Sequence, residues 1–151
     1  MNKSRTVKER IKPLWGNLMT KSVLVIDDSA SIVSIVKAVL RENGFNSLSA
    51  SNGEMGLKVA GEENPSLIVL DRHMEGMDGN QVLTRLKKDR FLSNIPVVML
   101  TSENKIEEIK TSMALGAAAY IIKPFQPKDF IAKINAVLVK KSGEAGIRHV
   151  K

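Results

Sequence analysis

Short apolar runs alternate with longer amphipathic stretches along most of this chain, and the alternation limits the folds it can adopt. Five strand-like runs are separated by segments whose apolar residues recur at helical spacing; the runs are 22–26, 47–50, 67–70, 97–100 and 119–122. Strands that alternate with helices build βαβ units with right-handed crossovers and a parallel sheet. Segment 22–139 is therefore predicted to form one α/β domain around a five-stranded parallel sheet.

The helical segments have clear stop signals. The first, Ser31 to Arg41, carries an apolar stripe and is followed by Asn43-Gly44, a typical helix end. We expect the fourth helix to begin near Glu103 and the fifth to end near Leu138, after a stripe that starts at Phe130.

Composition narrows the class of protein. The chain has 151 residues, 43% of them hydrophobic and 26% charged, which is ordinary for one globular domain. It contains no cysteine, so disulfides and thiolate metal sites are excluded. No apolar stretch approaches the ~20 residues that span a bilayer, and no signal peptide is recognisable. We expect a cytoplasmic protein that does not insert into membranes.

The net charge of +7 is concentrated at the two ends. Residues 1–21 hold six basic residues against Glu9, and residues 140–151 hold four against Glu144, which leaves the segment between them close to neutral. Charged ends of this kind are usually solvated tails, and no helix-turn-helix pattern accompanies them. Nucleic acid is therefore not expected as a partner.

Polar residues suited to phosphate or metal chemistry follow four of the apolar runs. They are Asp27-Asp28, Asp71, Thr101 and Lys123. In an open parallel sheet the carboxyl ends of the strands meet at one edge, where ligands bind. We therefore expect three carboxylates, one hydroxyl and one ammonium to share a small pocket.

This set of side chains predicts a phosphoryl-accepting site. A carboxylate can take a phosphoryl group as an acyl phosphate, and Asp71 is the candidate nucleophile. Three adjacent carboxylates repel one another unless a cation relieves them, and Mg²⁺ is the cation that prefers oxygen ligands of this kind. Phosphoryl transfer needs mainly positioning and charge neutralisation, which this set supplies.

Together, these pieces resemble the receiver domain of bacterial two-component signalling. The resemblance rests on Val25-Ile26-Asp27-Asp28-Ser29, Asp71 through Gly79, Thr101-Ser102 and Lys123-Pro124-Phe125. It is similar in particular to a stand-alone response regulator of the chemotaxis type, with a receiver over 21–140. The resemblance implies a flavodoxin-like (βα)5 doubly wound fold with strand order 2-1-3-4-5.

The resemblance also implies a role for each site residue. Asp28 and Asp71 would ligate Mg²⁺ directly, Asp27 through water, and His73 through its backbone carbonyl. Lys123 would neutralise phosphoryl oxygens and pair with Asp71 at rest, with a cis bond to Pro124.

Three further roles follow from the same resemblance. Thr101 would hydrogen-bond the phosphoryl group, and Tyr120 would turn inward as a switch when Thr101 moves toward the phosphate. His73 and Glu103 would tune the lifetime of the acyl phosphate. One residue departs from the pattern, since Glu75 stands where these proteins often have proline, and the loop loses a φ constraint.

The predicted function is phosphoryl acceptance from a sensor histidine kinase. The output would be phosphorylation-dependent binding to a downstream protein target or a phosphatase, through the last two helices and the last strand, in chemotaxis by analogy. The dozen residues after the last predicted helix leave no room for an effector domain. The chain would catalyse only its own phosphorylation and slow dephosphorylation.

Other functions remain open at this point. A phosphorelay intermediate would return its phosphate to a second histidine protein. A Mg²⁺-dependent aspartyl-phosphate phosphatase would carry Asp-x-Asp, whereas Asp71 is followed by Arg72 and His73. A flavin module would need a phosphate-cradling loop where Asp27-Asp28 stands.

The ends are predicted to lie outside the domain. Residues 1–20 form a basic extension, predicted to be flexible, with Val7, Ile11, Leu14, Trp15 and Leu18 at helical spacing that Pro13 and Gly16 interrupt. Residues 141–151, with Gly143 and Gly146, are predicted to be a disordered tail.

Overall fold

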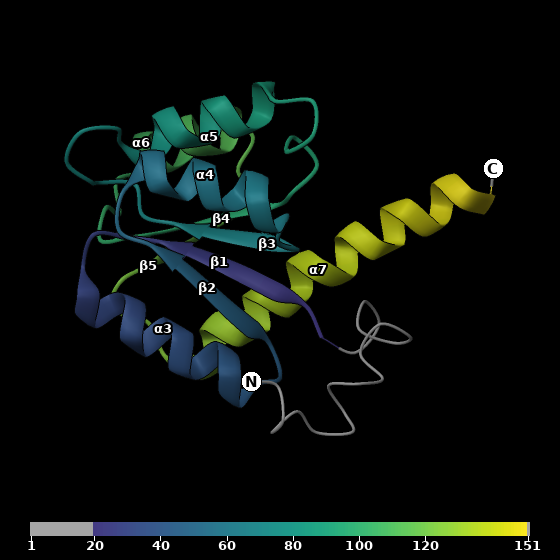
Figure 1. The fold of residues 1–151 in the computed structure, drawn as a ribbon, viewed down its shortest axis with the longest axis horizontal. Coiled ribbons are helices and arrows are strands. Elements are labelled where there is room, and N and C mark those ends of the chain that lie inside the picture. Colours follow the sequence, from purple (N-terminus) through teal and green to yellow (C-terminus); the bar gives the residue numbers. More distant parts are fainter. Residues whose placement is uncertain (1–19, 151) are drawn as a thin grey trace, which may run out of the picture.

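A computed structural model describes the chain from Thr20 to Val150, with side chains as far as Gly143. Five parallel strands form one sheet in the order β2-β1-β3-β4-β5 (Figure 1). This is the flavodoxin-like (βα)5 arrangement predicted from the sequence. Strand order reverses beside β1, so the chain winds first toward β2 and then back toward β5.

Strands and helices alternate without exception through the described residues. The strands are β1 (Ser22–Ile26), β2 (Asn46–Ala50), β3 (Leu67–Leu70), β4 (Val97–Thr101) and β5 (Ala119–Ile122). The helices are α3 (Ala30–Glu42), α4 (Gly53–Glu63), α5 (Gly79–Lys88), α6 (Ile106–Ala114) and α7 (Pro127–Val150).

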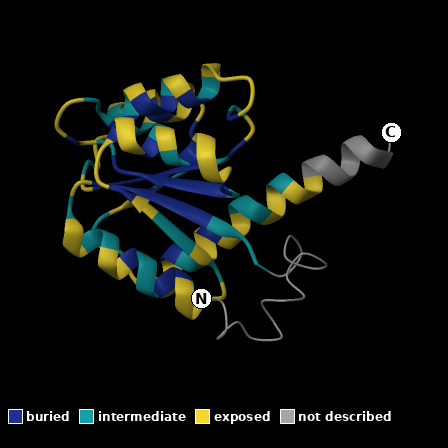
Figure 2. Ribbon diagram, in the orientation of Figure 1, coloured by how far each residue is buried: buried dark blue, intermediate teal, exposed yellow. Residues whose placement is uncertain are grey.

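The sheet lies between two helical layers. One face packs against α4 and α5, through buried residues that include Leu24, Leu70 and Leu83, and α6 lies on this side. The other face packs against α3 and α7, through residues that include Val69 and Phe130. Figure 2 shows that the central strands are buried while the outer faces of the helices are exposed. Burial on both faces explains why β1, β3 and β4 are almost entirely apolar.

The last hydrogen bonds of the sheet place the functional residues. The backbone N–H of Asp71 donates to the carbonyl of Ile26, 2.9 Å away, and that of Asp27 donates to the carbonyl of Ala50. The N–H of Lys123 donates to the carbonyl of Thr101, 2.8 Å away. These residues are therefore fixed at the carboxyl edge of the sheet by the same ladder that holds the strands.

The predicted strands agree with the structure to within one residue, and two helix boundaries differ by more. α6 begins at Ile106 rather than near Glu103. The Thr101 hydroxyl accepts from the N–H of Glu103, and the Glu103 carboxylate accepts from the N–H of Lys105. These local side-chain hydrogen bonds hold residues 103–105 in a loop, and the helix starts after it.

α7 is the second difference, because it continues to Val150 where the sequence predicted an end near Leu138 and a disordered tail over 141–151. Gly143 and Gly146 each disfavour a helix by about 1 kcal/mol relative to alanine, but both keep the N–H that the helix needs. Residues 1–19 of the predicted extension lie outside the described residues. Among the helices of 20–150, none is both long enough and apolar enough to cross a membrane.

Candidate functional site

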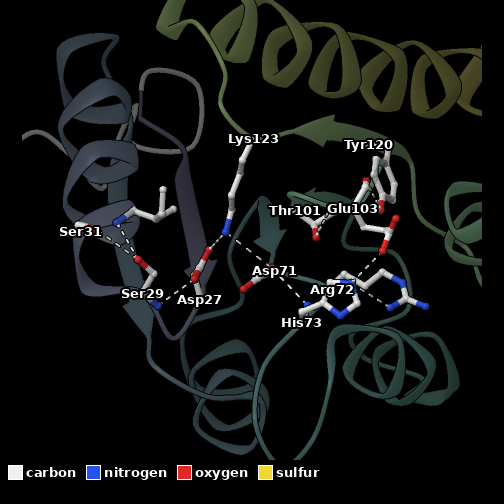
Figure 3. A network of polar contacts seen from close by, with 11 residues as sticks. Asp27, Ser29, Ser31, Asp71, Arg72, His73, Thr101, Glu103, Tyr120 and Lys123 are labelled. Carbon is white, nitrogen blue, oxygen red and sulfur yellow. Dashed lines mark hydrogen bonds and ion pairs between the residues drawn. The ribbon is translucent and has the colours of Figure 1, made fainter. Parts of the chain in front are cut away.

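Asp71 is the centre of the site. It follows β3 directly and its side chain is buried. Its Oδ1 lies 3.3 Å from the backbone N–H of His73, which donates to it, and 3.7 Å from Nζ of Lys123. A carboxylate at this position is anchored on one side and faces a cation on the other (Figure 3).

Asp27 and Lys123 form a close ion pair at the centre of the site. Nζ of Lys123 donates to Oδ2 of Asp27 at 3.0 Å, and the N–H of Ser29 donates to Oδ1 at 2.9 Å. Both oxygens of this buried carboxylate therefore have partners within the chain. The Lys123–Pro124 peptide bond is cis, as predicted, and Lys123 points back toward the carboxylates (Figure 3).

Three carboxylates converge here. One oxygen from each of Asp27, Asp28 and Asp71 lies within 4.8 Å of the others. Asp28 is exposed, whereas the other two are buried, so the cluster opens to solvent on one side. Burial, together with the negative charge of Asp27, raises the pKa of the Asp71 carboxyl to about 6, although the Lys123 ammonium and the His73 N–H act in the opposite direction. The site holds more negative charge than its one nearby ammonium balances.

Thr101 and Tyr120 connect the site to the loop before α6. Thr101 is fully buried at the end of β4, and its hydroxyl accepts from the N–H of Glu103 at 3.2 Å. The half-buried Tyr120 donates its hydroxyl to the carbonyl of Glu103 at 3.3 Å. Burial raises the pKa of the Tyr120 hydroxyl, which keeps it protonated and able to donate. The two predicted switch residues thus hold the same loop residue from two sides.

A chain of charged residues surrounds the mouth of the site, and the sequence analysis did not anticipate part of it. The partly exposed His73 ring lies 3.8 Å from the Glu103 carboxylate, so both predicted lifetime residues occupy this rim. Arg72, next to Asp71, forms an ion pair with Glu108 on α6 and lies 3.5 Å from the His73 ring. The Arg72–Glu108 pair joins residues 36 positions apart. The only sequence signal for it was that Arg72 directly follows Asp71.

The loop between β3 and α5 follows Asp71 directly and is ordered by its own hydrogen bonds. Gly76 has a φ of +76°, a value that favours glycine, and Asp78 and Gln81 form a reciprocal capping box at the start of α5. The N–H of Gly79 donates to the carbonyl of Arg72 at 2.9 Å. Glu75, the residue in place of proline, is exposed, so the capping box and this hydrogen bond order the loop without it.

A comparison with known protein families identifies the domain. Residues 23–135 match the response regulator receiver domain. The chain belongs to that family. Its members are signalling proteins of two-component systems, and the predicted resemblance is confirmed at the level of the receiver domain.

Curated relatives agree over the same region. A probable transcriptional regulator, ycf27, of Porphyridium aerugineum is 40% identical over 121 residues, covering 80% of this chain and 49% of the relative. The alkaline phosphatase synthesis transcriptional regulatory protein PhoP of Bacillus subtilis is 37% identical over 120 residues, again 80% of this chain and 49% of the relative. The chain spans about half the length of the curated relatives it matches.

Solved structures support the same fold. The chemotaxis protein CheY4 of Vibrio cholerae superposes with a TM-score of 0.75 at 28% identity, over 78% of this chain and 98% of CheY4. NtrX of Brucella abortus superposes with a TM-score of 0.82 at 26% identity, over 88% of this chain and 30% of NtrX. Receiver domains in proteins of very different length thus share this architecture.

Proposed function

We propose that this receiver domain accepts a phosphoryl group on Asp71 from a histidine kinase and signals through phosphorylation-dependent binding to another protein. The observation that supports it most directly is the placement of Asp71. Its buried carboxylate has a cation 3.7 Å away and two further carboxylates within 4.8 Å, at the open edge of the sheet. An aspartate without a functional role would more commonly be exposed to solvent, with no buried cation or neighbouring carboxylates beside it.

The transfer uses this arrangement as follows. An oxygen of the Asp71 carboxylate attacks the phosphorus of a phosphohistidine, the P–N bond breaks, and the electron pair stays on the imidazole nitrogen, which takes a proton from solvent. The product is an acyl phosphate on Asp71. The Lys123 ammonium balances charge on the phosphoryl oxygens, and the Thr101 hydroxyl donates a hydrogen bond to one of them.

Mg²⁺ fits the donor set. The three carboxylates offer hard oxygen ligands, and the exposed side of Asp28 leaves room for the waters that Mg²⁺ retains. Because both oxygens of Asp27 are engaged by Ser29 and Lys123, Asp27 is suited to act through water, and Asp28 and Asp71 to bind directly, with the His73 carbonyl as the remaining protein ligand. The ion would supply positive charge opposite the transferred phosphoryl group.

Signalling follows from the link between Thr101, Glu103 and Tyr120. When the Thr101 hydroxyl turns to a phosphoryl oxygen, the N–H of Glu103 loses its acceptor and the loop before α6 is released. The Tyr120 hydroxyl, bonded to the same residue, then moves inward and alters the face formed by α6, β5 and α7. His73 and Glu103, at the rim, control how water reaches the acyl phosphate.

Intact mass spectrometry tests the proposal. The wild type and Asp71→Asn are incubated with acetyl phosphate, with and without Mg²⁺. We expect one added phosphoryl group only in the wild type and only with Mg²⁺. The absence of an adduct in the wild type, together with no binding of the phosphate mimic beryllofluoride, would refute it.

Two forms of output have support from the comparisons. CheY4, a chemotaxis protein, is matched over 98% of its length, which favours a single-domain regulator that acts by protein binding. The curated relatives are named as transcriptional regulators and are about twice the length of the matched region, which favours a receiver that controls transcription. Fluorescence anisotropy with labelled duplex DNA, before and after beryllofluoride, tests the second form, since DNA binding by this chain would support it and the first predicts no binding in either state.

A further inference from the structure

Two shallow hollows lie at the edge of the sheet opposite Asp71, where the strands begin. One lies between α7 and the turn at Gly44–Phe45, and the other between α7 and the loops 64–66 and 94–96. Leu138 and Ser142 of α7 line both, and so does Lys21, just before β1. The hollows therefore form one continuous surface on either side of the last helix.

This surface exposes large apolar side chains. Val139 on α7 is 70% exposed and Phe91, at the rim of the second hollow, is 78% exposed. Leu138 lies between them in both hollows. Isolated exposed apolar residues are common, but two of this size on one continuous hollowed surface are typical of a docking surface.

The charges at this edge are mixed, because Lys21 lines both hollows and Lys141 lines the second, while carboxylates lie at the nearby helix ends. In parallel βαβ units the helices end where the next strands begin, and their last carbonyls give that edge a negative potential. α4 ends in Glu62-Glu63 with no basic residue in its last turn, and its capping residue Asn64 lines the second hollow. α3 ends at Glu42 and is followed by Asn43, which lines the first. Because the residues that line the hollows include lysines and no carboxylate, the exposed apolar side chains, rather than charge, favour a partner here.

The N-terminal segment of this chain has apolar residues that suit this surface. It combines apolar residues with basic ones: Val7, Ile11, Leu14, Trp15 and Leu18 with Lys3, Arg5, Lys8, Arg10 and Lys12. It joins the described chain at Thr20, which itself lines the second hollow. Because an extended residue spans at most ~3.5 Å, Trp15 can reach any point within roughly 17 Å of Thr20.

We propose that residues 7–18 dock on this surface of their own domain, with Leu14, Trp15 and Leu18 covering Leu138, Val139 and Phe91. Because the surface lies at the opposite edge of the sheet from Asp71, docking needs no phosphoryl group. The proposal thus goes beyond the signalling function and stands apart from it.

The only tryptophan of the chain, Trp15, reports directly on docking. Its emission spectrum and its quenching by acrylamide are measured in the full chain and in a synthetic peptide of residues 1–20. We expect the full chain to emit at shorter wavelength and to be quenched several-fold less than the peptide, with no dependence on protein concentration. No phosphodonor is present, so the result is independent of whether Asp71 accepts phosphate.

Matched variants locate the contact. Val139→Glu places a charge on the surface, and Ile106→Glu places one on α6, at a side chain that is 69% exposed and away from the hollows. Both positions are exposed, so circular dichroism should show both variants folded. Only Val139→Glu should shift Trp15 emission and quenching to the values of the peptide.

Three results would overturn the proposal. Wild-type emission and quenching equal to those of the peptide would show that Trp15 is solvated. Equal effects of the two variants, or none from either, would place Trp15 elsewhere. A shift that disappears on dilution would assign the surface to the segment of a second copy.

Discussion

Gly79 is the residue at which the structure makes its sharpest prediction. A methyl group added there would lie 2.6 Å from Cα of Arg72 and 3.0 Å from the carbonyl carbon of Asp71, and closer still to the Asp71 carbonyl oxygen. These are backbone atoms, which cannot rotate away as a side chain does. In Gly79→Ala, α5 and the strand end that carries Asp71 must move apart by several tenths of an ångström.

The expected cost follows from that overlap. An extra methyl group forced into packed structure typically lowers the free energy of unfolding by about 1–3 kcal/mol. For a domain of this size, that loss lowers the urea midpoint by roughly 1 M. A displaced nucleophile loses alignment, and a shift approaching 1 Å can slow a reaction by as much as ~100-fold. Gly79→Ala should therefore both unfold at lower urea and accept phosphate from acetyl phosphate more slowly.

Gly61→Ala is the matched control. Gly61 lies within α4, and a methyl group there meets nothing within 4 Å. Alanine favours a helix over glycine by about 1 kcal/mol, so this variant should be more stable and equally reactive. The same chemical change is thus predicted to have opposite signs at two positions. A Gly79→Ala protein as stable and as reactive as Gly61→Ala would refute the reasoning.

Three other variants test separate contacts. Ser112→Ala removes the buried hydroxyl that donates to Asn80 Oδ1 at 2.9 Å, and should lower the free energy of unfolding in urea by about 1 kcal/mol; an unchanged midpoint would contradict this. Tyr120→Ala should leave phosphorylation intact but weaken the preference of the downstream partner for the phosphorylated form, and an unchanged preference would exclude the switch. Glu108→Gln breaks the partly exposed ion pair with Arg72. It should change the free energy of unfolding by less than about 1 kcal/mol but alter the lifetime of the acyl phosphate. An unaltered lifetime would limit this pair to a structural role.

Much of the fold could be predicted because the sequence signal is local. The run Leu67–Leu70 is wholly apolar, since β3 is buried on both faces, and its bounds were predicted to the residue. The convergence of Asp27, Asp71 and Lys123 was predictable for a related reason. Parallel strands bring their carboxyl ends to one edge whatever the distance between them along the chain.

Other features depend on contacts that leave no periodic signal. The late start of α6 follows from hydrogen bonds that Thr101 and Glu103 make to backbone N–H groups, which composition does not reveal. The Arg72–Glu108 pair depends on how α6 packs beside the end of β3. Ion pairs between elements are set by tertiary geometry, so an isolated arginine and glutamate in the sequence cannot predict them.

The most direct test of the central claim is to identify the phosphorylated residue. An acyl phosphate is reduced by borohydride to an alcohol, which converts a phosphorylated aspartate to homoserine and leaves other carboxylates unchanged. After incubation with acetyl phosphate and Mg²⁺, followed by borohydride and peptide mass spectrometry, we expect homoserine at position 71 alone. Homoserine at Asp27 or Asp28, or a phosphoryl group carried by His73, would contradict the account.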